Sequence, residues 1–346
     1  MTGSGSPLEG FVFRQRLAQS EAGEVWRAEQ SALERDVLVA IPAAAYRDAF
    51  DDTARGLARL KSQLFPDVID ILTTEASRCV ILEDAHARSI LSFLDGKRLA
   101  PEKALRLAGA LAEGLGALHR AHFVYGGLSP QRIFLTETQE PMLPDFSLMR
   151  REPGYGEGLA PSPVPPPAYY AAPELLASPE VADTRSDMFA LGLTLYSLIT
   201  GQTPFGALPP EEVPRVQRTV SIPSPADLVP GLPLPVAALL QRLTQRAPED
   251  RYADWEEVQT AICQAKQGIA PDAGDPATSV VAPPVKPVHA TAGLKLSAKA
   301  LRQFRSEREG AAGFAWGRLA VWIGLLVLLG VLFVWGAWCF IGRVFL

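Results

Sequence analysis

The spacing of apolar positions changes once along this chain. Up to about position 83 the apolar residues fall in short runs typical of strands, such as Val37–Ile41 and Val80–Leu82, with one helical stretch at Phe50–Leu64. Beyond that point the spacing becomes helical. The pattern predicts an α+β fold with a small sheet-rich lobe at 11–83 and a larger helical lobe at 84–267.

Three long helices are predicted in the second lobe. Pro101–Ala121 places Leu and Ala at i+3 and i+4 spacing, and a proline suits the first turn of a helix. Ser186–Thr200 is almost entirely apolar and is followed by Gly201, a residue typical of helix ends. Asp254–Gln267 is the third.

A long apolar segment follows near the C-terminus. Leu319–Ile341 contains no charged residue. About 23 residues at about 1.5 Å each extend over about 34 Å, more than the roughly 30 Å of a bilayer core. Arg318 and Arg343 bracket the segment, and tryptophans lie towards both ends, as interfacial aromatics do; these are Trp322, Trp335 and Trp338. The segment predicts a single transmembrane helix.

Basic residues are concentrated before this span rather than after it. By the positive-inside rule, everything before the span is expected in the cytoplasm, with 342–346 as a short tail outside. We therefore expect a single-pass protein of the cell membrane. Residues 294–318 are predicted to be a basic juxtamembrane segment, in which 294–309 is either a solvated flank or a helix that binds anionic lipid. Residues 268–293, rich in Pro, Ala and Gly, are predicted to be a linker.

Composition narrows the classes of function. The 346 residues are 48% hydrophobic and 21% charged, which is typical of a globular protein. The net charge of -5 argues against a nucleic-acid partner, which would require a strongly basic domain. Cys79, Cys263 and Cys339 are too far apart for a zinc site or a disulfide framework, and we expect buried or membrane-embedded thiols. The polar start at 1–7 predicts no secretory signal peptide.

Several short motifs occur in a fixed order between positions 11 and 267. They look like a glycine-rich loop, the strand that should end in lysine, a hinge, a catalytic loop H-R-D-L-x-x-x-N, D-F-G, A-P-E and a central helix; in order they are Leu17–Ala28, Val39–Pro42, Val80–Glu83, Tyr125–Ile133, Asp145–Ser147, Ala172–Glu174 and Ser186–Gly192. The series resembles the protein kinase family, in particular the bacterial Ser/Thr kinases of eukaryotic type. The resemblance implies a bilobal kinase-like domain over 11–267.

The positions that would carry the chemistry differ from the family pattern. The catalytic Asp is replaced by Gly127, the phosphate-binding Lys by Pro42, and the Asn that holds magnesium by Arg132. A glycine accepts no proton, a proline carries no charge, and an arginine places a positive charge where a cation should bind. These substitutions predict a domain without ordinary phosphoryl transfer.

Few of the motif positions that would bind a nucleotide keep a suitable residue. The first two glycine positions of the loop are Ala18 and Ser20, so phosphate binding should be poor. The resemblance leaves a few candidate positions: Gly23, Val25 and Glu83 for the nucleotide, and Asp145 either as a lone metal ligand or as the cap of a turn. We expect no cofactor, with weak binding of ATP and Mg²⁺ as the alternative.

Other side chains could replace the missing lysine or the missing base. Arg27 or Lys61 could replace the missing lysine, although each is more simply interpreted as a solvated surface charge. His119 or His122, just before the catalytic loop, could act as a base, although a helix-end histidine satisfied by backbone groups is the simpler interpretation.

The retained motif positions are mostly structural. By the resemblance, Glu174 and Arg251 form a buried salt bridge, and Asp187 hydrogen-bonds the backbone of the catalytic loop. The glutamate of the first-lobe helix is not identifiable, and Asp51 and Asp52 are the nearest acids. The retained residues favour a kinase-like shape without kinase chemistry.

Three functions remain open. The leading hypothesis is a membrane-anchored pseudokinase, a scaffold or allosteric module for other cytoplasmic or membrane proteins, with an active kinase among the candidate partners. The alternatives are an unconventional Ser/Thr protein kinase with residual ATP binding, and a nucleotide sensor without turnover. The proline-rich run 161–167 is either a stiff loop or a polyproline docking segment.

Overall fold

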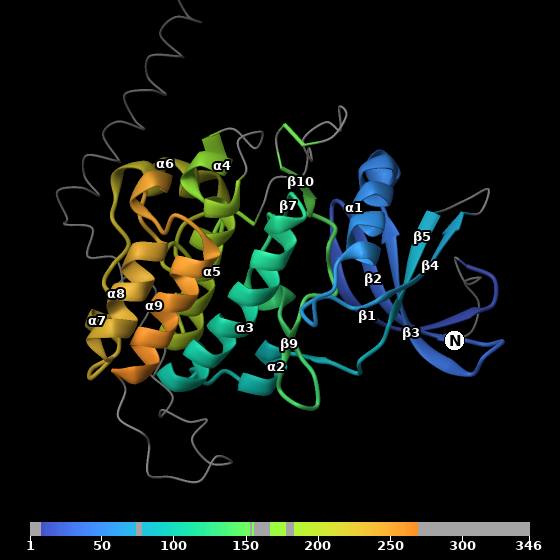
Figure 1. Cartoon of the computed structure of the whole chain (residues 1–346), viewed down its shortest axis with the longest axis horizontal. Coiled ribbons are helices and arrows are strands. Elements are labelled where there is room, and N and C mark those ends of the chain that lie inside the picture. Colours follow the sequence, from blue (N-terminus) through green and yellow to red (C-terminus); the bar gives the residue numbers. More distant parts are fainter. Residues whose placement is uncertain (1–7, 74–77, 153, 156–166, 178–182, 269–346) are drawn as a thin grey trace, which may run out of the picture. The chain divides into compact units, whose positions relative to one another are not determined.

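The computed structural model describes residues 8–73, 78–152, 154–155, 167–177 and 183–268 (Figure 1). The linker, the juxtamembrane segment, the span at Leu319–Ile341 and almost all of the proline-rich run lie outside these residues. Within the described part of the chain, no helix combines the length and the apolar character that crossing a membrane requires.

The first lobe is a five-stranded antiparallel sheet in the order β1-β2-β3-β5-β4. The strands are β1 (Phe11–Ser20), β2 (Gly23–Gln30), β3 (Arg35–Pro42), β4 (Val68–Thr73) and β5 (Arg78–Glu83). Alternate residues of β3 face two different apolar clusters: Leu38 lies in the main core, whereas Val39 packs with Phe11 and Ile81. Because both faces are covered, the central strands appear in the sequence as continuous apolar runs.

Helix α1 (Arg47–Arg59) lies against β4 and adds Phe50 to the main core. It differs from the predicted helix Phe50–Leu64, because the backbone is already extended at Leu60, while Leu64 reaches the core from a loop. The predicted helix was too long at its C-terminal end because Leu64 continues the helical spacing of apolar residues beyond Arg59.

The second lobe consists mainly of helices, with α3 packed against α5 and α9, and α5 against α8 (Figure 1). The helices are α2 (Ile90–Leu94), α3 (Pro101–Arg120), α4 (Pro173–Ala177), α5 (Thr184–Thr200), α6 (Val213–Thr219), α7 (Pro225–Leu228), α8 (Leu234–Leu243) and α9 (Trp255–Gln267). The three long predicted helices are confirmed to within two residues. Helix α5 begins at Thr184 because the Asp183 carboxylate accepts from the N–H groups of Arg185 and Ser186, and it ends at Gly201 in the left-handed conformation (φ 73°).

Short strands position the motif loops between the lobes. Strand β7 (Phe123–Val124) pairs with β10 (Arg150–Arg151), and β8 (Phe134–Leu135) pairs with both β6 (Arg88–Ser89) and β9 (Pro141–Met142). The catalytic-loop segment lies between β7 and β8 and contains the 3-10 turn Pro130–Arg132. Its Tyr125 and Ile133 belong to the same core cluster as Leu38 of the sheet and Leu111 of α3. The loop is therefore fixed by packing from both lobes.

Candidate functional site

An ion pair joins Arg132 and Asp145, the two positions that the motif resemblance assigns to magnesium binding. Arg132 Nη1 lies 2.9 Å from Asp145 Oδ2, and the two side chains are only 11% and 4% exposed. Burial lowers the pKa of the Arg132 guanidinium, but the neighbouring Asp145 carboxylate and Tyr125 raise it, and the net pKa lies above its ordinary value. Arg132 is therefore a permanent cation at this site.

Both carboxylate oxygens of Asp145 are engaged. Arg132 lies against Oδ2, and Oδ1 accepts a hydrogen bond of 3.0 Å from the backbone N–H of Ser147. The Tyr125 hydroxyl donates to the backbone carbonyl of Asp145 at 2.7 Å, and burial raises the pKa of this phenol, so it stays a neutral donor. Asp145 thus caps a turn and pairs with an arginine, and a divalent cation would have to displace Arg132 to reach it.

The room for a catalytic side chain is filled at Gly127. A Cβ atom added there would lie 2.7 Å from Cδ1 of Leu148, which is 3% exposed. Leu148 also packs against Ala22, at the turn between β1 and β2. An apolar side chain therefore fills the space beside Gly127, the position that the motif resemblance assigns to the general base.

The β1–β2 hairpin is tied to the Asp145–Leu148 loop and to β3. The hydroxyls of Ser20 and Ser147 are 3.2 Å apart across the two lobes, and the N–H of Ala22 donates to the Ser20 hydroxyl at 3.2 Å. Gly23 has a φ of 154°, and a Cβ there would collide with the carbonyl of Ile41. This close approach of two backbones explains why the last glycine of the loop remains.

Pro42 is accommodated at the end of β3. It lies opposite Gly23 of β2, whereas the pairing of β3 with β5 stops at Ala40. The missing N–H of the proline therefore breaks no sheet hydrogen bond on the β5 side. Of the other predicted nucleotide positions, Val25 is 3% exposed in the main core, and Glu83 is exposed at the end of β5.

The acids of α1 bind arginines. Asp51 Oδ2 lies 2.5 Å from Arg78 Nη1 of β5, and Asp52 receives two hydrogen bonds of 2.6 and 2.9 Å from Arg151 of β10. Helix α1 is thus joined to the loop after the D-F-G-like motif by a bidentate ion pair.

Arg27, one of the two residues proposed to replace the missing lysine, is held by other partners. Arg27 pairs with Asp84 and donates to the Ala87 carbonyl at 3.0 Å, so its interpretation as a solvated surface charge is wrong. The sequence could not suggest this pairing, because Asp84 lies far along the chain from β2. Lys61 is exposed in the loop after α1.

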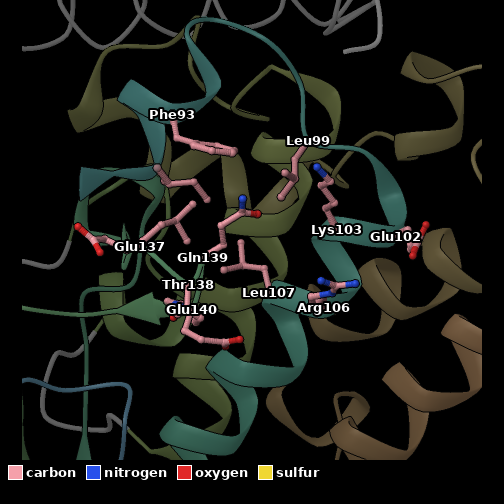
Figure 2. A pocket seen from close by; sticks show the side chains of 13 residues that line it. Phe93, Leu99, Glu102, Lys103, Arg106, Leu107, Glu137, Thr138, Gln139 and Glu140 are labelled. Carbon is pink, nitrogen blue, oxygen red and sulfur yellow. The ribbon is translucent and has the colours of Figure 1, made fainter. Parts of the chain in front are cut away.

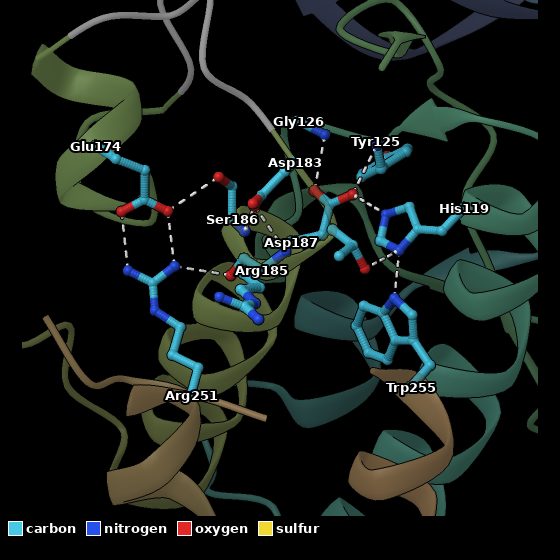
Figure 3. A network of polar contacts seen from close by, with 11 residues as sticks. His119, Tyr125, Gly126, Glu174, Asp183, Arg185, Ser186, Asp187, Arg251 and Trp255 are labelled. Atoms are coloured by element: carbon cyan, nitrogen blue, oxygen red, sulfur yellow. Dashed lines mark hydrogen bonds and ion pairs between the residues drawn. The ribbon is translucent and has the colours of Figure 1, made fainter. Parts of the chain in front are cut away.

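His119 is satisfied by side chains, which corrects the expectation of backbone partners. Its Nε2 lies 2.9 Å from Asp187 Oδ2, its Nδ1 lies 2.6 Å from the Thr184 hydroxyl, and Trp255 also donates to Nδ1 (Figure 3). His122 stacks on Tyr155, with ring centroids 3.7 Å apart.

The retained structural residues lie in the same region as His119 (Figure 3). The Asp187 carboxylate accepts from the backbone N–H groups of Tyr125 and Gly126 at 2.7 and 2.8 Å. Arg251, whose side chain is fully buried, donates to both oxygens of Glu174 at 2.6 and 2.8 Å. These contacts fix the backbone of the catalytic-loop segment and helix α4, which begins within the A-P-E motif.

The two described cysteines differ in exposure. Cys79 is buried, and burial together with the Asp70 charge raises its pKa to about 11. Cys263 is exposed, so the expectation of a buried thiol is wrong there. Its place on the outer face of α9 explains the exposure, since Ile262 beside it takes the buried position. Cys339 lies outside the described residues.

No group of three or more His, Cys, Asp or Glu side chains suited to a metal ion occurs among the described residues. A cavity of about 430 Å³ lies between α2, α3 and the β8–β9 hairpin (Figure 2). Acidic Glu102 and Glu140 and basic Lys103 and Arg106 line it together with apolar residues such as Phe93. It is distinct from the region around Arg132 and Asp145, because none of the substituted motif positions lines it.

The family model for the protein kinase domain matches residues 52–264, more than half of the chain. The chain belongs to the protein kinase family. The sheet-rich first lobe, the helical second lobe and the order of the motifs agree with this membership.

Relatives in the family carry the names of Ser/Thr kinases. The chain is 28% identical over 293 residues to serine/threonine-protein kinase pkn2 of Myxococcus xanthus, covering 78% of this chain and 34% of the relative. It is 25% identical over 305 residues to PknL of Mycobacterium bovis, covering 84% and 75%, and 30% identical over 281 residues to PknK of the same species, covering 76% and 24%. The chain thus spans about a third of pkn2 and a quarter of PknK.

Proposed function

We propose that this chain is a catalytically inactive member of the protein kinase family, which acts as a scaffold or allosteric partner of other proteins. The observation that carries the proposal is the buried ion pair between Arg132 and Asp145. A guanidinium in contact with the remaining metal-ligand candidate repels Mg²⁺ and neutralises the charge of the carboxylate that would bind it. The side chains at this position do not fit a magnesium ion.

The surrounding positions support the same conclusion. Phosphoryl transfer depends on metal ions that neutralise the phosphates, a lysine that positions them and an acid that orients the nucleophile. Loss of a general base alone typically lowers a rate by roughly 10²- to 10⁴-fold. Here Gly127 provides no base, Pro42 provides no charge, and Leu148 fills the space between Gly127 and the β1–β2 hairpin.

The proposal includes a membrane anchor and protein partners. It places the kinase-like domain at the cytoplasmic face of the cell membrane, held by Leu319–Ile341, with a short tail outside. The partners would be other cytoplasmic or membrane proteins, with an active kinase among the candidates. The charge pattern of the sequence and its apolar C-terminal segment support this part.

A phosphorylation assay tests the proposal. The purified full-length chain is incubated with γ-labelled ATP, Mg²⁺ or Mn²⁺ and a general protein substrate, alongside Asp145→Ala. We expect the same background label with both proteins. Label above background that disappears in Asp145→Ala would show an active enzyme and overturn the proposal.

The second candidate is an unconventional Ser/Thr protein kinase that binds ATP and Mg²⁺ weakly. The names of the relatives favour it more than they favour an inactive protein. A third candidate is a nucleotide sensor without turnover. A nucleotide-dependent rise in melting temperature without label transfer would distinguish it from both others.

A further inference from the structure

A second cavity lies in the helical lobe among α4, α5, α6 and α8, with a volume of about 270 Å³. Its walls include the apolar side chains of Phe189, Phe205, Val220 and Ile222. Phe189 and Phe205 are 1% and 0% exposed, so these walls are fixed parts of the core. The cavity is lined by none of the substituted catalytic positions, and it is independent of the proposed loss of catalysis.

One buried polar side chain lines this cavity without a partner. Gln217 of α6 is 3% exposed, and neither its Nε2 nor its Oε1 makes a hydrogen bond in the described part of the chain. Its backbone carbonyl is held by Arg246 Nε at 3.1 Å, so this part of α6 is fixed while the side-chain amide is unsatisfied. A buried amide without hydrogen bonds is unfavourable, and such groups call for an explanation.

The cavity remains open to the surface at its rim. Ser221, Gln241 and Arg246 line it and are exposed. Three rotatable bonds allow the Gln217 amide to turn towards a molecule that enters. The volume is slightly below the roughly 300–1,000 Å³ of ordinary ligand pockets, which suits a ligand of about one ring.

We propose that this cavity binds a small molecule with a primary carboxamide on a compact apolar or aromatic body. A primary carboxamide has the donor and acceptor set that Gln217 has, so the two amides can exchange a pair of N–H···O bonds. Such a ligand satisfies both orphan amide atoms at once, while its body packs between Phe189 and Phe205. A carboxylate would leave the Gln217 carbonyl without a donor.

Benzamide serves as the probe, titrated into the full-length chain to about 10 mM with ligand-observed NMR as the readout. A Kd on the order of 1 mM is expected for a ligand of this size. N,N-dimethylbenzamide, which has no N–H donor, should bind at least about tenfold more weakly, corresponding to the loss of one good hydrogen-bonding interaction.

Two variants complete the design. Gln217→Leu removes the amide while keeping a similar volume, and should weaken benzamide binding at least about tenfold. Gln241→Leu makes the same change at the exposed rim and should leave the affinity unchanged. Because Gln217→Leu removes an unsatisfied buried amide, it should fold and melt no lower than the wild type. Absence of saturable benzamide binding, or equal affinity in the wild type and Gln217→Leu, would overturn the proposal and leave a water-filled or merely apolar cavity.

Discussion

Replacing Arg132 with methionine tests whether the ion pair at the metal position holds the site together. Methionine keeps an unbranched side chain and removes the charge, so Asp145 Oδ2 loses the partner that lies 2.9 Å away. The carboxylate is 4% exposed and has no access to bulk water as a replacement. The variant therefore leaves a buried, unpaired negative charge.

The size of the expected stability loss follows from the distance between the two charges. Two unit charges at this distance attract each other by about 6 kcal/mol at an effective dielectric constant of about 20. Desolvation offsets part of the attraction in the native protein, and removing one partner of a buried pair typically costs about 3–5 kcal/mol. We expect a loss of that size in the free energy of unfolding for Arg132→Met. Asp145→Asn, which keeps the turn cap but removes the charge, should also be destabilised.

The assay is urea unfolding of the full-length chain, followed by tryptophan fluorescence. The double variant Arg132→Met/Asp145→Asn contains no unpaired charge and should be more stable than the sum of the two single losses predicts. Arg120→Met is the matched control, because Arg120 and Glu256 form a surface pair with 64% and 73% exposed side chains, and it should cost less than about 1 kcal/mol. Single losses below about 1 kcal/mol that add within about 0.5 kcal/mol would refute the reasoning.

Three further predictions concern packing, structure and thiol chemistry. Gly127→Asp should lower the free energy of unfolding by about 1–3 kcal/mol through overcrowding, with partial recovery when Leu148→Ala is added; a Gly127→Asp chain as stable as the wild type would contradict this. Glu174→Ala leaves a fully buried guanidinium unpaired and should cost about 3–5 kcal/mol in urea unfolding, whereas a cost below about 1 kcal/mol would argue against a buried pair. Cys79, with a pKa raised from 9.0 to about 11, should resist iodoacetamide at pH 8 until the chain is unfolded, while exposed Cys263 reacts, as peptide mass spectrometry would show. Between pH 9.0 and about pH 11 the Cys79 thiol loses its proton in the unfolded state but keeps it in the folded state, so the free energy of unfolding should fall as the pH rises. The same pH dependence of stability in the wild type and in Cys79→Ala would count against the raised pKa.

The elements with long apolar segments were predictable from the sequence. Strand β3 appears as a continuous apolar run because both faces of the sheet are covered, and α5 appears as an apolar segment that ends at Gly201. The sequence prediction began this helix at Ser186 and did not recognise Asp183 as its cap. The end of α1 was not predictable. Leu64 has the spacing of a helical residue but enters the core from a loop, and only tertiary packing distinguishes the two.

The site was predictable in what it has lost but not in what replaces the lost groups. Motif comparison identifies Gly127, Pro42 and Arg132 as substituted positions. It does not show that Leu148 fills the space at Gly127, because the contact depends on how the loop after Asp145 turns. One signal was present in the sequence: opposite charges occupy two positions that should hold the same metal ion, and such charges in one small space form an ion pair.

Binding of Mg·ATP to the unmodified full-length chain tests most directly whether Arg132 has taken the place of the metal. The melting temperature and isothermal titration heats are measured with ATP, with and without Mg²⁺, on the wild type and on Arg132→Asn. We expect no Mg²⁺-dependent change for the wild type, because the guanidinium holds Asp145. Arg132→Asn should gain a Mg²⁺-dependent shift, since its amide restores a ligand and releases the carboxylate. Saturable, Mg²⁺-dependent ATP binding by the wild type would contradict the assignment of Arg132 to the metal position.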